Sequence, residues 1–345
     1  MGERKLERTL DRTLLLHVGT HKTGTTALQA LLVLNREALA AQGIYIPDTG
    51  RVHQTADYDT PGHHALAWEL SAPPPHPLIE SAVEELRAHA ARTAVVSSEE
   101  FSPIHHHVEA MSSLRSAFAD AGYRTVVVLY LREQARYAES IFQQNIRDHR
   151  DLAFAATIEE ILDQGFRVRG DFRFEFCYSR MLDALAQAFG GENIVVRPYL
   201  PDRGPEYIHR DFLRVLGMLH GSFAMDFKMT IANESYTLRA LLQALYQTLR
   251  NNETIADDAL AAFVRDRHPE FDERMFEHRF LLLQHAEATA FLQRFAADNA
   301  LVAERSGAQI PFRSPRDIPP PEHAIWSEAV IHRRVFEEAT TAWRR

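Results

Sequence analysis

Leu14–Thr26 reads LLLHVGTHKTGTT, a short apolar run that ends in a turn rich in glycine and threonine. The run predicts a strand, and apolar residues at helical spacing predict a helix after it: Ala27, Leu28, Leu31, Leu32 and Leu34. A strand, a tight loop and a helix point backbone N–H groups and the positive end of the helix dipole at one spot, which favours a phosphate. Lys22 adds a positive charge there, and Thr25 and Thr26 add hydroxyl donors.

The order of residues in this loop differs from that of the nucleotide triphosphatases. Their pattern is G-x-x-x-x-G-K-[ST], with the lysine directly after the second glycine. Here Thr25 follows Gly24, and Lys22 comes two residues before that glycine. We therefore expect an anion other than the β- and γ-phosphates of a magnesium nucleotide. The plain alternative is a strand–helix connection with an incidental lysine.

A second motif follows the apolar run Val126–Leu131, which is typical of a buried parallel strand. Arg132 stands at the carboxyl end of this strand, where open α/β sheets bind their ligands. Ser140 comes two helical turns later, and an arginine fork with a hydroxyl suits a second, separate phosphate. Without the other motif, Arg132 would be interpreted as a surface arginine and Ser140 as a neutral helix residue. Two anion sites at two strand ends predict a ligand with phosphates at two places.

Together the two motifs resemble those of the PAPS-dependent sulfotransferases. The segment His17–Gln29 is similar to their 5′-phosphosulfate loop, and Leu129–Ser140 is similar to their 3′-phosphate motif. Three further segments resemble the bacterial sulfotransferase family proteins: Val95–Glu99, Phe189–Tyr199 and Asn233–Ser235. The resemblance covers residues 13–240, about two thirds of the chain.

The resemblance implies an α/β, P-loop-like three-layer fold, with a central parallel sheet flanked by helices and a helical C-terminal part. Residues 1–345 would form a single sulfotransferase domain, with an α/β cofactor-binding core over 13–240 and a helical C-terminal extension over 241–345. The implied activity moves the sulfuryl group of PAPS (3′-phosphoadenosine-5′-phosphosulfate) to a hydroxyl acceptor, a carbohydrate or glycolipid rather than a small phenol. The product nucleotide is adenosine 3′,5′-bisphosphate, and no metal is expected.

The resemblance also implies which residues bind the nucleotide: His21, Lys22, Thr23, Gly24, Thr25, Thr26, Arg132, Ser140 and Tyr199. Lys22 stabilises the charge on the departing 5′-phosphate. Tyr199 contacts the adenine, or else is a half-buried packing residue. The chain lacks the arginine-lysine-glycine loop of the cytosolic sulfotransferases, which leaves Lys228 as a weak candidate for the 3′-phosphate.

Three residues compete for the base that takes the proton of the acceptor. Glu99 comes just past an expected strand over 93–97, at an edge that should face the cofactor; its alternative roles are a cap or a partner of Lys22. His63 and His64 stand where a glycine-proline loop enters a helix, and histidine titrates near neutral pH. Their alternative role is that of polar residues at a helix start.

Glu100 and the run His105–His107 are expected to play no part in the site. Glu100 should point away from Glu99, because neighbours in extended chain face opposite ways. His105–His107 predicts a solvated loop, because three consecutive residues of a regular element cannot converge on one metal ion.

Composition excludes several classes of protein. The net charge of −9 and a pI near 6.1 argue against a nucleic-acid binder. The single Cys177 cannot form an internal disulfide, which favours a reducing compartment. The charged segment 1–8 lacks the apolar core of a signal peptide, and no stretch approaches the roughly 18 apolar residues of a membrane span. We expect a cytoplasmic protein.

Longer-range patterns predict strands over 13–19, 93–97, 124–131 and 193–197, and helices over 25–41, 78–91, 206–218, 234–250 and 325–344. Residues 255–305 predict a helical region whose buried face comprises Phe280, Leu281, Leu283, Ala286, Phe291 and Phe295.

Two other functions stay open. A P-loop nucleotide phosphotransferase or kinase is disfavoured by the position of Lys22. A non-catalytic nucleotide-binding scaffold is disfavoured by the intact Lys22, Arg132 and Ser140.

Overall fold

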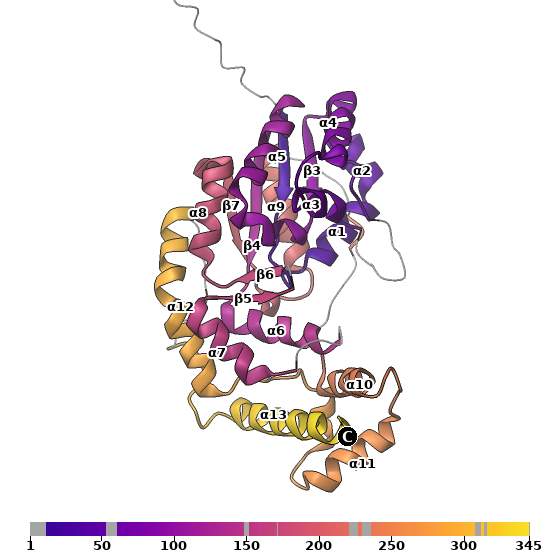
Figure 1. Ribbon diagram of the computed structural model, residues 1–345, viewed down its shortest axis with the longest axis vertical. Helices are drawn as coiled ribbons and strands as arrows, with labels where there is room; N and C mark the ends of the chain where they lie inside the picture. The colour runs from indigo at the N-terminus through magenta and orange to yellow at the C-terminus, as the bar shows by residue number, and fades with distance from the viewer. Residues whose placement is uncertain are drawn as a thin grey trace, which may run out of the picture. The chain divides into compact units, whose positions relative to one another are not determined.

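The computed structural model describes residues 12–52, 61–147, 152–170, 172–220, 227–229, 236–307, 312–313 and 316–344 (Figure 1). The chain divides into two compact units that interleave along the sequence. The first unit takes residues 1–132, 178–233 and 299–310, and the second takes residues 133–177, 234–298 and 311–345. Both units draw residues from the predicted core and from the predicted C-terminal extension. The single-domain organisation stays a prediction.

A five-stranded parallel sheet forms the centre of the first unit. Its strands, in spatial order, are β2 (Ile44–Tyr45), β3 (Thr93–Ser97), β1 (Arg12–His17), β4 (Tyr123–Leu131) and β7 (Ile194–Pro198). In register, Leu15 lies level with Val95 on one side and Val126 on the other. The chain leaves β1 toward β3 and later crosses to β4 on the opposite side. The carboxyl end of β1 is therefore a topological switch point, where open α/β sheets bind ligands.

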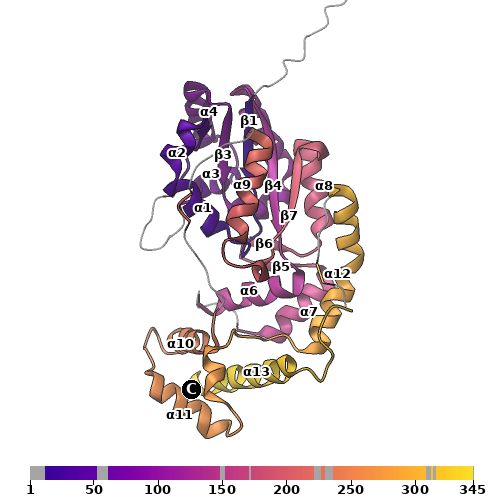
Figure 2. The same ribbon diagram turned by 180° about the vertical axis from the view of Figure 1, so that it is seen from behind.

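Helices cover both faces of this sheet. On one face lie α1 (Thr25–Leu34) and α9 (Tyr207–His220), whose apolar side chains share a core with the strands (Figure 2). On the other face lie α5 (Val108–Asp120) and α8 (Tyr178–Phe189), which contact β4 and each other. The remaining helical pieces of this unit are α2 (Arg36–Ala41), α3 (His64–Leu70), α4 (Pro77–His89), η1 (Glu99–His106), η2 (Gly191–Asn193), η3 (Pro201–Arg203) and the end of α12 (His285–Ser306). The predicted fold class is confirmed: helices flank a central parallel sheet, and further helices follow in the C-terminal part.

The predicted single helix over 25–41 is wrong, because the chain forms two helices there. Asn35 separates them: its amide Nδ2 donates a hydrogen bond to the carbonyl oxygen of Leu31, 2.7 Å away. A side chain that bonds back to the carbonyl four residues earlier competes with continuation of the helix. The predicted strand over 93–97 is confirmed, and the one over 124–131 begins one residue earlier.

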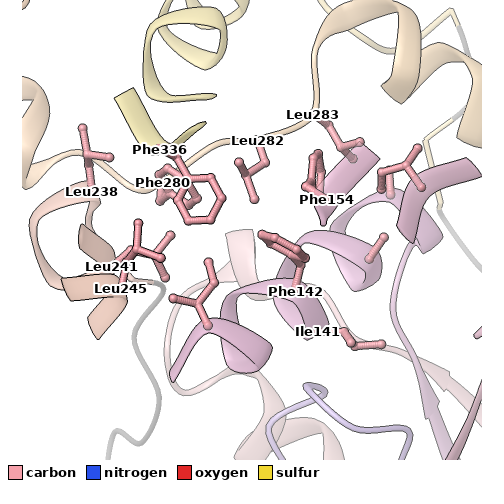
Figure 3. Close-up of a cluster of buried hydrophobic side chains, with 14 of the residues drawn as sticks. Ile141, Phe142, Phe154, Leu238, Leu241, Leu245, Phe280, Leu282, Leu283 and Phe336 are labelled. Atoms are coloured by element: carbon pink, nitrogen blue, oxygen red, sulfur yellow. The ribbon is translucent and has the colours of Figure 1, made fainter. Parts of the chain in front are cut away.

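The second unit is mainly helical. It contains α6 (Gln134–Arg147), α7 (Phe154–Gln164), the antiparallel strands β5 (Phe166–Arg169) and β6 (Phe172–Glu175), α10 (Leu238–Leu249), α11 (Asp257–Arg267), η4 (Glu273–Glu277), the start of α12 (His285–Ser306) and α13 (Ala324–Trp343). Figure 3 shows its core, in which Phe142 of α6 lies among residues from distant parts of the chain. The Phe142 ring packs edge-on against Phe154, at 4.8 Å between centroids, and against Phe336, at 5.8 Å.

The prediction of a continuous helical region over 255–305 is wrong between η4 and α12. Residues 278–284 are not helical there, because the buried carboxylate of Glu139 accepts hydrogen bonds from the backbone N–H groups of Leu282 and Leu283, at 2.9 and 3.0 Å. Of the predicted buried face, four residues are buried and two are not: Phe280, Leu283, Phe291 and Phe295 are buried, Leu281 is half-buried and Ala286 is exposed.

Candidate functional site

The loop between β1 and α1 is held by threonine side chains. Thr20 Oγ1 donates a hydrogen bond to the carbonyl oxygen of Tyr130 on β4, 3.1 Å away, and Thr23 Oγ1 donates to the carbonyl oxygen of Thr20 at 2.6 Å. Both threonines are fully buried. Lys22, with φ of 65°, and Gly24, with φ of 81°, adopt the left-handed conformation. This conformation is uncommon for a lysine and often marks functional sites.

Two glycines allow other groups to approach this loop closely. A Cβ at Gly19 would lie 2.9 Å from Thr25 Oγ1 and 3.0 Å from His17 Nε2, and a Cβ at Gly24 would lie 3.1 Å from the ring of Tyr199. Thr25 begins α1 and is buried, and among the described residues its Oγ1 has no hydrogen-bond partner. A buried hydroxyl at the positive end of a helix is a donor suited to an anion.

Arg132 connects the end of β4 to the loop. Its Nη1 donates a hydrogen bond to the carbonyl oxygen of Lys22 at 2.8 Å, and its guanidinium lies over the ring of Tyr199, 5.5 Å from the centroid. Hydrogen bonds to the backbone hold Arg132 and Tyr199 in place. Tyr178 Oη donates to the carbonyl oxygen of Arg132 at 2.6 Å, and the backbone N–H of Tyr199 donates to the carbonyl oxygen of Leu131 at 2.7 Å. The structure thus brings three of the predicted nucleotide-binding residues together, and the arginine lies directly against the loop.

Ser140 belongs to the other unit. It lies on α6 and is buried, at 8% exposure. Its contact with the nucleotide stays a prediction. Asn233 and Ser235, and the charged segment 1–8, lie outside the described residues.

Lys228 lies far from the loop along α1. Its backbone N–H donates a hydrogen bond to Asn35 Oδ1 at 2.9 Å, and Asn35 Nδ2 donates to its carbonyl oxygen at 2.8 Å. Asn35 follows the last residue of α1, and ten helical residues span about 15 Å. Lys228 is therefore placed at the end of the helix opposite to the loop.

Glu99 follows β3 and holds its carboxylate against α1. Glu99 Oε2 accepts a hydrogen bond from Gln29 Nε2 at 2.9 Å and lies 3.9 Å from His64 Nδ1. The Glu99 side chain keeps 13% exposure, whereas Gln29 and His64 are buried. A carboxylate that is fixed between two elements and still reached by solvent has the geometry that a general base needs.

His63 has a structural role. Its Nδ1 accepts a hydrogen bond from the backbone N–H of Ser97 at 3.2 Å, so that Nε2 carries the proton and donates to the carbonyl oxygen of Pro47 at 3.0 Å. Burial lowers the pKa of His63 to about 4, against the opposing effect of the hydrogen bond to Pro47. With both ring nitrogens occupied, this histidine is a poor base at neutral pH. Glu99 and His64 remain the candidates.

Two buried histidines lead us to expect acid sensitivity. Burial lowers the pKa of His17 to about 3, as it lowers that of His63 to about 4. Both values lie below the roughly 6.5 of an unfolded histidine, so the unfolded chain takes up protons first. The free energy of unfolding should therefore fall as pH drops from about 6.5 toward 4. Thermal unfolding between these pH values measures the slope. His63→Gln should flatten it and exposed His107→Gln should not; a slope that is unchanged in both variants contradicts the assignment.

Glu100 contacts the loop, which the sequence did not predict. Its Oε1 lies 3.5 Å from His21 Nε2, and its Oε2 accepts a hydrogen bond from Trp68 Nε1 at 3.2 Å. Burial raises the pKa of Glu100, but the hydrogen bonds and charges of its partners outweigh burial and lower the pKa overall. The expectation that Glu100 points away failed because residues 99–106 form a 3₁₀ helix, which Ser98 Oγ caps by accepting from the Glu100 N–H at 3.1 Å.

The predicted solvated loop at His105–His107 is wrong for His105, whereas His106 and His107 are exposed as predicted. His105 and His106 belong to η1, and His105 is buried with its Nδ1 2.7 Å from the carbonyl oxygen of Ser102. Across the described ranges, no three histidine, cysteine or acidic side chains gather in an arrangement that could hold a metal ion. In the same ranges, no helix has both the length and the apolar character needed to cross a bilayer.

Comparison with solved structures finds a similar chain, whereas two other comparisons find none. No family model matches the chain, and no curated protein matches it. Among solved structures, the chain is similar to the crystal structure of a sulfotransferase from Alicyclobacillus acidocaldarius, with 16% identity over 87% of this chain and 97% of that one, and a TM-score of 0.42. A likeness at this identity and score does not transfer a function.

Proposed function

We propose that this protein transfers the sulfuryl group of PAPS to a hydroxyl acceptor. The observation that carries the proposal is the hydrogen bond from Arg132 to the carbonyl oxygen of Lys22, which joins the two anion-binding motifs at adjacent strand ends. The loop, with Lys22 and the unsatisfied hydroxyl of Thr25, receives the 5′-phosphosulfate. Arg132 receives the 3′-phosphate, and Tyr199 contacts the adenine.

The chemistry follows from the placement of the side chains. PAPS supplies an activated sulfuryl group, whose bond to the 5′-phosphate oxygen breaks as the acceptor oxygen bonds to sulfur. Glu99 takes the proton of the acceptor hydroxyl. Lys22 and the N–H groups at the start of α1 stabilise the charge left on the 5′-phosphate. Gln29 holds the Glu99 carboxylate in place, through the hydrogen bond at 2.9 Å.

The acceptor in this proposal is a carbohydrate or a glycolipid, and the reaction takes place in the cytoplasm. Both statements extend the family resemblance of the loop and strand-end motifs. A magnesium-dependent kinase is the rival activity, and the position of Lys22 ahead of Gly24 speaks against it.

A calorimetric titration tests the nucleotide specificity. We expect adenosine 3′,5′-bisphosphate to bind at least about tenfold more tightly than AMP, because a second phosphate adds charge-assisted hydrogen bonds to Arg132. Arg132→Ala should remove this preference. Arg124→Ala is the matched control, since Arg124 lies at the opposite end of β4, is exposed and donates a hydrogen bond to Asn193. Equal, weak binding of both nucleotides to the wild type, or tight binding of Mg-ATP instead, counts against the proposal.

A further inference from the structure

His17 is a buried histidine at the end of β1, where the loop toward α1 begins. Its ring lies edge-on to Tyr130, with 5.7 Å between centroids, and to Phe212, with 5.9 Å. Its Nδ1 lies 2.8 Å from Ser97 Oγ on β3, and these three contacts hold the ring in one orientation. Among the described residues its Nε2, also buried, has no hydrogen-bond partner. A buried polar atom of this kind calls for an explanation.

This Nε2 lies close to the first residue of α1. A Cβ placed on Gly19 would lie 3.0 Å from His17 Nε2 and 2.9 Å from Thr25 Oγ1, so both atoms border the same point. They can be no farther apart than these two distances together, a gap that a small movement or one water molecule closes. Gly19 does not have a positive φ, so it is this close approach, and not the backbone conformation, that requires a glycine.

The hydrogen bond to Ser97 decides which nitrogen of His17 carries the proton. Burial lowers the pKa of His17 to about 3, so the ring is neutral at neutral pH and has one N–H. Ser97 is buried, and in the described part of the chain its hydroxyl has His17 Nδ1 as its partner. The hydroxyl therefore donates to Nδ1, because it would otherwise be a buried donor without an acceptor. The proton of the ring is then on Nε2, beside Thr25.

We propose that His17 is a positioning residue for the Thr25 hydroxyl: its Nε2–H donates toward Thr25 Oγ1, directly or across one water molecule, and so turns the Thr25 proton toward the bound anion. This inference rests on the proposed function for the identity of that anion, the 5′-phosphosulfate end of PAPS. A hydroxyl has one proton and two lone pairs. Once a lone pair of Thr25 accepts from His17, the Thr25 proton is left for an oxygen of the anion.

The opposite tautomer of His17 would have the opposite effect. With the proton on Nδ1, Nε2 would be an acceptor and would compete with the anion for the Thr25 proton. A hydrogen bond to an ionised group is roughly twice as strong as a neutral one, and a donor that already points at the anion needs no reorganisation when the anion binds. Positioning the proton in advance therefore raises the affinity for the anion without adding a contact.

A double-mutant cycle on nucleotide affinity tests this role. Calorimetry with adenosine 3′,5′-bisphosphate should show about tenfold weaker binding by Thr25→Ala, which removes the hydroxyl. His17→Asn keeps a polar group only near the place of Nδ1 and should weaken binding about fivefold. His17→Gln, whose amide nitrogen reaches the place of Nε2, should stay within about twofold of the wild type. In the Thr25→Ala background, His17→Asn should have no further effect, because His17 acts through Thr25. His107→Asn, at an exposed histidine, is the matched control.

Imidazole nitrogen NMR tests the tautomer in the unsubstituted protein. The chain has 18 histidines, and the His17 ring is assigned by the signal that His17→Gln removes. We expect the proton on Nε2, and we expect its resonance to shift when the bisphosphate binds. A proton on Nδ1 overturns the inference. An effect of His17→Asn that persists undiminished in the Thr25→Ala background also overturns it, since packing alone then explains that effect.

A parallel titration with Mg-ATP separates this inference from the proposed function. Coupling between His17 and Thr25 with Mg-ATP, in a protein that ignores the bisphosphate, keeps the role of His17 and rejects the sulfotransferase. Tight binding of the bisphosphate without coupling rejects the role of His17 alone. If neither nucleotide binds the wild type, both are rejected, because Thr25 then has no anion to receive its proton. Thermal unfolding checks each variant, and if His17→Asn does not fold, the tautomer and its response to the bisphosphate decide.

Discussion

Replacing Lys22 with alanine is expected to lower kcat by about two to three orders of magnitude, the loss typical of removing one group that stabilises charge in a transition state. The substitution keeps the loop, because lysine and alanine have similar backbone preferences in the left-handed conformation at φ 65°. The hydrogen bond from Arg132 ends on the backbone carbonyl of residue 22 and survives as well. Transfer of labelled sulfate from PAPS measures the loss, and calorimetry shows whether adenosine 3′,5′-bisphosphate still binds.

Lys228→Ala is the control for this variant. The chain holds only three lysines, and Lys228 is exposed at the far end of α1, where its backbone pairs with Asn35. We expect its kcat to match that of the wild type. A Lys22→Ala protein that turns over at the normal rate rejects the assignment of the leaving-group lysine.

Replacing Glu99 with glutamine should lower kcat by about two to four orders of magnitude, the range that general-base catalysis supplies. Glutamine has the same shape and can still accept the hydrogen bond from Gln29, so the packing against α1 persists. Only the capacity to take a proton is lost. The nucleotide dissociation constant should therefore stay within about twofold, because a base acts on the transition state rather than on nucleotide binding.

Two further variants sharpen this test. In Glu99→Ala, added formate should restore part of the activity by replacing the missing carboxylate. Glu109→Gln, on the exposed surface of α5, should leave the rate unchanged. Normal turnover by Glu99→Gln would exclude Glu99 and point to His64, which lies 3.9 Å from it.

The sheet could be predicted because its strands are continuous apolar runs, which can be recognised in the sequence without knowledge of the fold. The strand over 93–97 has the predicted bounds, and β4 differs by one residue. The second unit was not predictable in this way. Its core joins α6, α10 and α13, and the carboxylate of Glu139 keeps residues 278–284 out of a helix through bonds that no sequence period records.

Part of the candidate site could likewise be predicted from the sequence, and part could not. Lys22 and Arg132 could be placed near each other, because both follow strands whose carboxyl ends share one edge of a sheet. The use of both His63 nitrogens by backbone groups could not be foreseen, since their partners come from residues 47 and 97. Glu100 turns inward because Ser98 caps the 3₁₀ helix by accepting a hydrogen bond from the Glu100 N–H. A serine two residues before a glutamate is not a distinctive pattern, so the sequence alone did not reveal this cap.

The core around Phe142 has a consequence for how the protein is made. Phe142 of α6 is covered by Phe336 of α13, and Ala339 and Trp343 complete the same cluster. About 190 residues separate the two phenylalanines, so at roughly 5–20 residues per second a ribosome needs on the order of 10–40 s to deliver the missing helix. During that interval the apolar residues of the nascent α6 lack their final packing partners on α13.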